Sequence, residues 1–264
     1  MEYKGYQHIE RLGTPEVEGI LDGECFIYPK IDGTNGQAYC LDGKIYVGSR
    51  KRFITPEDDN AGCAKAILEN ENICNYLKDH VGHHLFFEWL VPHTIKNYEV
   101  DAWRKPYVFD VAVETDGNFV YLPYKTYAPL LKSYGITVIE PMDHLFNPTL
   151  DMLMTLVENN HYLMQDGAIG EGIVIKNYQY RNRYGRQTWA KIVRNEFKQD
   201  KRKQEIQDGK IKQGGFGKGS DIKSGKSRKK KTNEAQGAFD GSYNCIVCFL
   251  CGLYHRFYGS PGHG

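Results

Sequence analysis

The segment Lys30-Ile31-Asp32-Gly33-Thr34-Asn35 constrains this chain more than any other, because it predicts a lysine between a strand and a tight turn. The preceding Phe26-Ile27-Tyr28 is aromatic and β-branched, which is typical of a strand. Gly33 lets the backbone bend and approach a ligand closely. A lysine there suits attack on phosphorus, provided that burial or nearby cations lower the pKa of its amine. An isolated K-x-D-G is equally compatible with a surface turn, so the rest of the chain has to decide.

The next segments predict strands that carry charged residues. Residues 26–52 predict strands with a hairpin turn at Leu41-Asp42-Gly43-Lys44. Arg50, Lys51 and Arg52 follow this hairpin, and these three cations are either solvated or contact phosphate or ribose. Glu88 lies inside the apolar run 85–90. Because a buried carboxylate is costly unless it is paired, Glu88 requires a partner or a ligand. Residues 106–113 predict another strand, with Asp110 inside it.

Two strands predicted near residue 180 also carry embedded charges. Residues 171–176 predict a strand opened by Gly170 and Gly172, with Glu171 and Lys176 at its two ends. On an ideal strand these two side chains project to opposite faces, whereas a bend at Gly172 would bring both to one cleft. Residues 187–194 alternate, which places Lys191 on the face of Trp189 and Val193. Lys191 therefore also requires an anionic partner.

Helices are predicted in three places. They are residues 60–80, residues 127–134 before Gly135, and a helix opened by Asn147 as N-cap and Pro148 as first residue. The last helix would carry Leu150, Leu153, Met154 and Val157 inward.

Composition divides the chain into two predicted parts. Residues 1–198 hold 21 lysines and arginines against 27 acidic residues, whereas residues 199–231 hold 12 against 4. We therefore predict one folded domain over 1–198 and a basic, disordered, low-complexity tail over 199–264. The acidic balance of the domain means that any affinity for nucleic acid must come from a local patch. The tail ends in Cys245, Cys248, Cys251 and His255, whose spacing is compatible with a metal site or with unliganded side chains.

The N-terminus shows no signal peptide, and the chain has seven cysteines, an odd number. Both observations favour reduced thiols and a cytoplasmic location. No apolar run approaches the length of about 18 residues that a membrane-spanning helix needs. We expect no membrane association and infer no protein partner.

The order of these motifs resembles that of the covalent nucleotidyltransferases, the superfamily of ATP-dependent DNA ligases, RNA ligases and capping enzymes. The matching segments, in order, are Lys30-Ile31-Asp32-Gly33-Thr34-Asn35, Gly48-Ser49-Arg50, Glu88-Trp89, Tyr107-Val108-Phe109-Asp110, Glu171-Gly172-Ile173-Val174-Ile175-Lys176 and Ala190-Lys191-Ile192. Thr34-Asn35 and Phe109-Asp110 are most similar to the RNA ligase family, in the branch typified by RNA ligase 2. The resemblance covers about residues 1–198 and stops where that branch continues into a helical domain.

The resemblance implies an α+β nucleotidyltransferase (ATP-grasp-like) domain, with two antiparallel sheets and flanking helices that hold ATP between them. It also implies an ATP-dependent RNA ligase of RNA repair, which joins 5′-phosphate and 3′-hydroxyl ends through a lysyl–AMP on Lys30. Lys176 and Lys191 would offset phosphate charge and depress the pKa of Lys30. Glu171 would bind Mg²⁺ or Mn²⁺, and Arg50 and Glu88 would hold the ribose. Phe109 would stack on adenine, and Asn35 would contact substrate or phosphate.

Three alternatives share part of this pattern. A DNA ligase or a GTP-using capping enzyme would also need Lys30 and the two later lysines. A nucleotide- or RNA-binding module that no longer seals would explain the absence of a recognisable helical domain. The sequence leaves open whether the RNA ends lie in a nicked duplex or a single strand.

Overall fold

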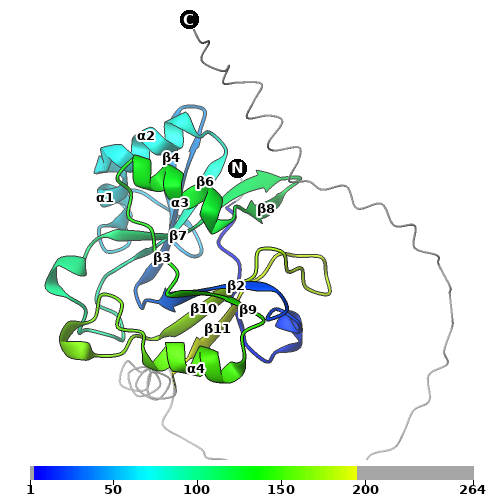
Figure 1. Cartoon of the computed structure of the whole chain (residues 1–264). Helices are drawn as coiled ribbons and strands as arrows, with labels where there is room; N and C mark the ends of the chain where they lie inside the picture. The colour runs from blue at the N-terminus through cyan, green and yellow to red at the C-terminus, as the bar shows by residue number, and fades with distance from the viewer. Residues whose placement is uncertain (1–2, 195–264) are drawn as a thin grey trace, which may run out of the picture. The chain divides into compact units, whose positions relative to one another are not determined.

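Two β-sheets pack against each other in residues 3–194, the part of the chain that the computed structural model describes (Figure 1). Sheet A has the order β1-β11-β10-β2-β9, and sheet B has the order β5-β4-β3-β6-β7-β8. The strands of sheet A are β1 (Glu10–Arg11), β2 (Glu24–Lys30), β9 (Asp143–Phe146), β10 (Gly172–Lys176) and β11 (Ala190–Val193). Those of sheet B are β3 (Thr34–Leu41), β4 (Lys44–Gly48), β5 (Phe53–Ile54), β6 (His83–Trp89), β7 (Pro106–Thr115) and β8 (Asn118–Tyr121).

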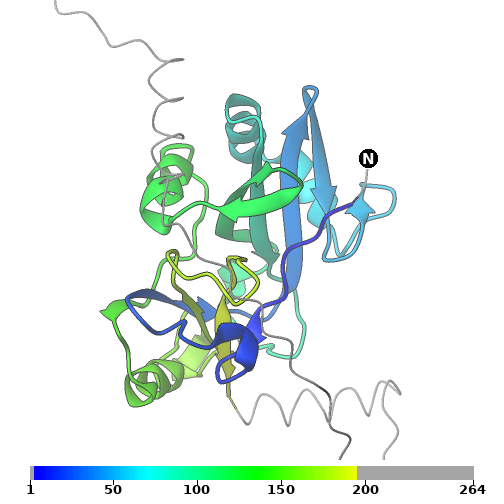
Figure 2. The same cartoon turned by 90° about the vertical axis from the view of Figure 1, so that its right-hand side faces the viewer.

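Helices cover the outer face of each sheet (Figures 1 and 2). Helices α1 (Cys63–Glu69), α2 (Glu71–Asp79) and α3 (Tyr124–Ser133) pack on sheet B, and α4 (Leu150–Glu158) packs on sheet A. Short 3₁₀ turns lie at Pro15–Val17, Val100–Ala102 and Gln165–Gly167. This arrangement confirms the predicted α+β fold with two sheets and flanking helices. Sheet A differs from the prediction in one detail, because β1 pairs with β11 in parallel.

The alternation of β2 explains how Lys30 comes to face the space between the sheets. Phe26 and Tyr28 belong to the apolar layer between the sheets, whereas Cys25 and Ile27 pack toward α4. Successive side chains of a strand point to opposite faces, so Lys30 shares the inner face with Tyr28. The same alternation in β11 places Trp189 inward and Ala190 outward, as predicted.

The predicted hairpin is confirmed, and the helix predicted over residues 60–80 is two helices. Asp42 and Gly43 have φ angles of 50° and 74°, the left-handed pair that a two-residue turn between β3 and β4 requires. The helical pattern breaks at Asn70, which has extended backbone angles. Its side chain accepts a hydrogen bond from the backbone N–H of Ile73 and caps α2.

The predicted start of the last helix is wrong. Thr149 is the N-cap of α4, and its side chain accepts a hydrogen bond from the N–H of Met152. Asn147 has a φ of 48° instead, and its side-chain oxygen accepts a hydrogen bond from the N–H of Gly23 at 2.6 Å. Only two of the four side chains predicted to point inward are buried in α4. Leu153 and Val157 are buried, but Leu150 and Met154 are 56% and 41% exposed.

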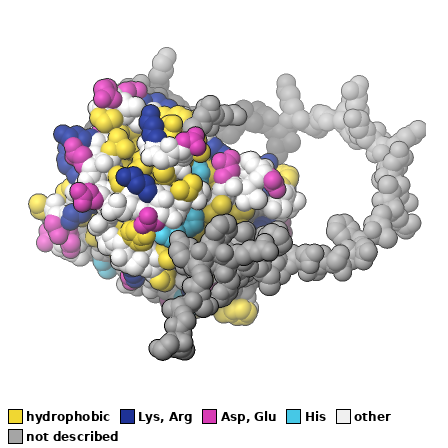
Figure 3. All heavy atoms as spheres, turned by 90° about the horizontal axis from the view of Figure 1, so that it is seen from above, with side chains coloured by type: hydrophobic (Ala, Val, Ile, Leu, Met, Phe, Trp, Pro, Cys, Tyr) yellow, Lys and Arg dark blue, Asp and Glu magenta, His cyan; other side chains and the backbone are white. Residues whose placement is uncertain are grey.

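The predicted domain boundary after Lys198, the basic tail and the Cys245–His255 set all lie outside the described residues. Within 3–194, no helix is long and apolar enough to cross a membrane. On the face seen in Figure 3, cationic, acidic and hydrophobic side chains are interspersed instead of gathered in one patch. Cys25, Cys40, Cys63 and Cys74 are free thiols.

Candidate active site

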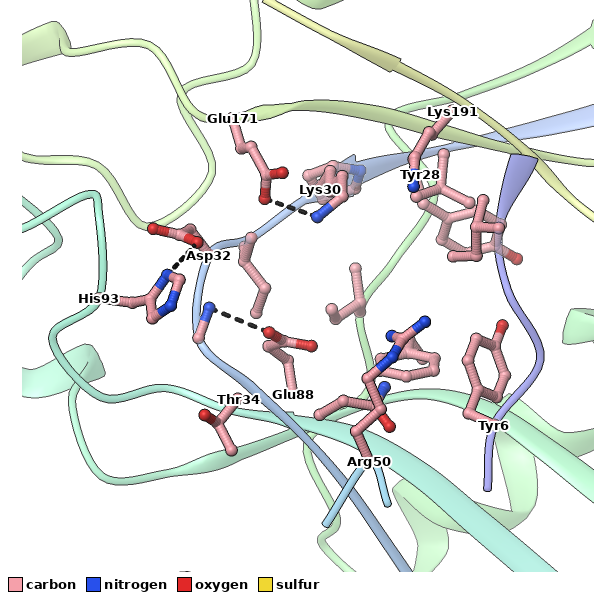
Figure 4. Close-up of a pocket in the computed structure, with 18 of the residues that line it drawn as sticks. Tyr6, Tyr28, Lys30, Asp32, Thr34, Arg50, Glu88, His93, Glu171 and Lys191 are labelled. Carbon is pink, nitrogen blue, oxygen red and sulfur yellow. Dashed lines mark hydrogen bonds and ion pairs between the residues drawn. The ribbon is translucent and has the colours of Figure 1, made fainter. Parts of the chain in front are cut away.

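A cleft of about 800 Å³ lies between the two sheets. Its walls include all eight candidate residues from the sequence: Lys30, Asn35, Arg50, Glu88, Phe109, Glu171, Lys176 and Lys191. These residues come from β2, β3, the turn after β4, β6, β7, the residue before β10, β10 and β11 (Figures 1 and 4). The fold therefore brings together side chains that are spread over 162 positions of the sequence.

Lys30 and Glu171 face each other across the pairing of β2 with β10. Lys30 lies opposite Gly172 in the strand register, and its Nζ donates a hydrogen bond to Glu171 Oε2 at 2.6 Å. A Cβ on Gly172 would lie 2.0 Å from the carbonyl oxygen of Ile192, so only glycine fits there. The sequence analysis predicted that a bend at Gly172 would bring Glu171 and Lys176 to one cleft, and both residues line the cleft.

The pKa of Lys30 is raised in this structure, contrary to the expectation that the site depresses it. Burial is the largest single influence and lowers the pKa, but the carboxylates of Glu171, Glu88 and Asp32 together outweigh it. The free site therefore holds Lys30 as an ammonium. A nucleophilic Lys30 requires that the charge of these carboxylates be offset, so that burial then favours the neutral amine.

Glu88 lies at the base of the turn that follows Lys30 (Figure 4). One of its carboxylate oxygens accepts a hydrogen bond from the N–H of Gly33 at 3.0 Å. Burial raises the pKa of Glu88 to about 7, partly offset by Lys30. A Cβ on Gly33 would lie 2.5 Å from the carbonyl oxygen of Trp89, so this turn also accepts only glycine. The sequence predicted that Glu88 needs a partner or a ligand. In the structure, Glu88 has the N–H of Gly33 as a partner, and it also lines the cleft.

A β-bulge in β7 turns two consecutive side chains, Phe109 and Asp110, toward the inside. In the pairing with β6, Asp110 lies opposite Phe86, and the next pair joins Phe87 to Val108, so Phe109 has no opposite residue. A bulge of this kind re-aims the side chains of a strand. Phe109 consequently lines the cleft, while Asp110 is fully buried behind it.

Lys176 is held by Asp110. Its Nζ lies 2.8 Å from Asp110 Oδ1, donates to the carbonyl oxygen of Phe109 at 2.5 Å, and sits 4.6 Å from the ring centre of Tyr28. Burial lowers the pKa of Lys176 and raises that of Asp110, and the attraction between them opposes both shifts. Lys176 therefore has its counter-ion within the protein, which the sequence did not predict.

Lys191 has a different environment. Burial and then the charge of Lys30 lower the pKa of Lys191, with Glu171 opposing and Arg11 and Arg50 adding to the effect. No ion-pair partner of Lys191 lies among residues 3–194. The anionic partner that the sequence predicts for Lys191 would therefore have to be a bound ligand.

The carboxylate of Asp32 binds the loop that follows β6. Its carboxylate accepts hydrogen bonds from the N–H groups of Thr94 and Ile95 at 2.7 and 2.8 Å, and it lies 2.9 Å from His93 Nδ1. The N–H of Asp32 in turn donates to the hydroxyl of Tyr98 at 2.8 Å. This acid of the nucleophile motif therefore anchors residues 93–98 beside the cleft.

Several cleft residues were missed by the sequence analysis. They include Tyr6, Arg11, Asn60 and His93. Tyr6 and Arg11 belong to an N-terminal stretch whose β1 strand is two residues long, too short for periodicity to reveal.

The cleft suits a nucleotide and a hydrated divalent cation. Pockets for small ligands span about 300–1,000 Å³, with apolar walls and a few polar groups. Mg²⁺ is usually held by one or two carboxylates, with water and substrate phosphates completing its shell. Glu171 fits this arrangement, since its side chain is buried and opens onto the cleft beside Lys30. No group of three His, Cys, Asp or Glu side chains within residues 3–194 forms a metal cage.

The sequence model of the RNA ligase family matches residues 23–193. The chain belongs to the RNA ligase family. That match begins just before β2 and ends with β11, so it contains all eight candidate residues. No curated protein matches the chain.

Solved ligases share the fold of this family member. An RNA ligase of Naegleria gruberi with PPi is 19% identical with a TM-score of 0.56, over 74% of this chain and 57% of that one. An archaeal ATP-dependent RNA ligase is 16% identical with a TM-score of 0.56, over 77% and 51%. A putative ATP-dependent DNA ligase from Aquifex aeolicus is 17% identical with a TM-score of 0.52, over 72% and 49%. The chain thus spans about half the length of these proteins.

Proposed function

We propose that this chain is an ATP-dependent RNA ligase that seals 5′-phosphate and 3′-hydroxyl RNA ends through a lysyl–AMP on Lys30, in RNA repair. The observation that carries the proposal is the position of Lys30, inside the cleft and 2.6 Å from Glu171. Membership of the RNA ligase family supports it, as does the similarity to a Naegleria gruberi ligase solved with ATP and Mn.

The first step forms the covalent intermediate. Nζ of Lys30 loses a proton and attacks the α-phosphorus of ATP, an N–P bond forms, and the bond to the bridging oxygen breaks to release pyrophosphate. The charge of Lys30 lowers the pKa of Lys191, which places the two amines near each other, and Lys191 would offset the negative charge on the α-phosphate. Phe109 would stack on the adenine, Arg50 and Glu88 would hold the ribose, and Asn35 would donate its amide to phosphate.

Glu171 would hold the divalent cation, either Mg²⁺ or Mn²⁺. The cation would supply positive charge to the phosphates and to this carboxylate. A cation bound to Glu171 would offset the charge of this carboxylate, which is the strongest of the influences that raise the pKa of Lys30. Burial then favours the neutral, nucleophilic amine. The Lys30–Glu171 pair thus keeps the nucleophile protonated in the free site.

The later steps consume the intermediate. An oxygen of the RNA 5′-phosphate attacks the phosphorus of lysyl–AMP, the N–P bond breaks, and Lys30 regains its proton. The 3′-hydroxyl then attacks the 5′-phosphorus, a phosphodiester forms, and AMP leaves. We propose a cytoplasmic location and RNA ends as the partner.

Incubation with labelled ATP and a divalent cation tests the first step. We expect an adduct of one AMP on Lys30 by mass spectrometry, its loss in Lys30→Ala, and its persistence in Lys125→Ala. Lys125 is a matched control because its side chain is 64% exposed and lies outside the cleft. AMP on another lysine of the Lys30→Ala variant would overturn the assignment.

Two comparisons separate the alternatives. Labelled GTP in place of ATP would identify a capping-type enzyme. RNA-ended against DNA-ended nicks would identify a DNA ligase, which the likeness to the Aquifex aeolicus protein makes worth testing. Adduct formation without sealing of either nick would favour a module that only binds or activates.

A further inference from the structure

The N-terminal arm, residues 3–12, crosses from sheet B to sheet A although it lies outside the family match (Figure 2). At sheet B, the ring of Tyr3 packs on Phe53. In the middle, the hydroxyl of Tyr6 donates a hydrogen bond to Asp110. At sheet A, the N–H groups of Glu10 and Leu12 donate to the carbonyl oxygens of Trp189, directly before β11, and Lys191 at 3.1 and 3.0 Å. The arm is therefore fixed against both walls of the cleft.

This attachment places Arg11 beside Lys191. The two residues are direct partners in the parallel pairing of β1 with β11, so their side chains leave the sheet on the same face. Ile9 and Arg11 both line the cleft, as expected for positions two apart on one strand. The arm thus supplies a second cation next to a lysine of the site.

Neither of these two cations is neutralised within the part of the chain that the structure describes. The ion pairs there include none with Arg11 or Lys191. Lys176 and Arg52, by contrast, are paired with Asp110 and Asp58. Two adjacent cations repel each other, and an anion that lies between them would relieve this repulsion.

We propose that Arg11 binds a phosphate next to the α-phosphate that Lys191 would face, so that the two adjacent cations hold neighbouring phosphates. The proposal rests on the proposed function, since it assigns a second phosphate subsite to the same cleft. Arginine suits this role because its planar guanidinium donates two parallel hydrogen bonds to phosphate oxygens. The phosphate comes either from the β–γ end of ATP in the first step or from the RNA 5′-end in the second. Arg11 is exposed, so it is accessible to both.

Binding of inorganic pyrophosphate, measured by calorimetry on the full chain, tests the pair without any covalent step. We expect Arg11→Ala to weaken binding roughly tenfold, the equivalent of about 1.4 kcal/mol. Arg11→Lys should lose less, because it keeps the charge but not the two-pronged geometry. Arg183→Ala is the matched control, as an exposed arginine outside the cleft whose partner is Glu16. Pyrophosphate affinity unchanged in Arg11→Ala would overturn the proposal.

Two kinetic measurements then identify the source of the phosphate. A higher half-saturating ATP concentration for lysyl–AMP formation in Arg11→Ala would assign the β–γ end of ATP. An unchanged first step with slower AMP transfer from preformed lysyl–AMP to 5′-phosphorylated RNA would assign the RNA end. If the wild-type chain forms no lysyl–AMP, the proposed function fails, whereas the pyrophosphate result still decides the role of Arg11.

Discussion

Replacing Lys176 by methionine should expose the energetic cost of the buried charge behind the cleft. Methionine is similar in length and tolerates contact with aromatic rings, so the change removes the charge with little loss of packing. It leaves Asp110, which is fully buried, with the hydroxyl of Tyr6 and the indole N–H of Trp189 as its remaining side-chain donors. A buried charge that loses its partner costs about 3–5 kcal/mol.

The pH dependence of this cost has a definite sign. Without Lys176, the pKa of Asp110 rises further, because burial then acts with less opposition. The native state of the variant therefore binds a proton that the unfolded chain releases above its ordinary pKa of 3.8. The stability of the variant therefore falls as pH rises from the pKa of Asp110 in the unfolded chain to its higher pKa in the native state. The loss of stability relative to wild type should accordingly be larger at pH 7 than at about pH 5.

Thermal unfolding of both proteins at the two pH values measures this effect. Proton uptake by Asp110 recovers part of the cost, so we take about 3 kcal/mol, which corresponds to a fall in Tm of roughly 6–12 °C for a domain of this size. The double variant Asp110→Asn/Lys176→Met should regain most of the loss, because it removes the unpaired charge. A deficit below about 1 kcal/mol, or one that is equal at both pH values, would refute the reasoning.

Three further predictions concern the cleft and the tail. Glu88→Gln should gain stability relative to wild type as pH rises from about 5 to 8. The pKa of Glu88 is about 7 in the native state, so native wild type keeps a proton there that the unfolded chain loses near 4.5. Parallel profiles of stability against pH would contradict this. Gly33→Ala should lower the rate of lysyl–AMP formation at least tenfold, because its Cβ would lie 2.5 Å from the Trp89 carbonyl oxygen and displace the turn after Lys30; a wild-type rate would be evidence against that contact. Deleting residues 199–264 should preserve lysyl–AMP but flatten the salt dependence of RNA affinity by about 0.7 per lost phosphate contact, whereas an unchanged slope would show that the tail does not touch RNA.

The sequence by itself determined the residues that carry the site and the faces on which they lie. The alternation of Phe26, Tyr28 and Lys30 is local, and it places the lysine on the inner face of its strand whatever the strand pairs with. The turn at Asp42-Gly43 is equally local, because left-handed backbone angles select these residue types. Charged residues inside strand-like segments indicated Glu88, Lys176 and Lys191, since burial requires a partner for each.

Other features depended on pairings between distant segments, which no local pattern encodes. The bulge that turns both Phe109 and Asp110 inward exists only in the register of β7 against β6. The start of α4 was misplaced because a contact with Gly23 fixes Asn147 outside the helix. Arg11 reached the cleft through parallel pairing with β11, from a strand too short to recognise.

The charge state of Lys30 shows this dependence most directly. Its sequence context indicated a nucleophile, and chemistry required a lowered pKa. The tertiary structure instead surrounds the amine with the carboxylates of Glu171, Glu88 and Asp32, which together raise the pKa. The balance of burial and charge at Lys30 depends on distances between three segments of the chain, and those distances exist only once β2, β6 and β10 have packed together.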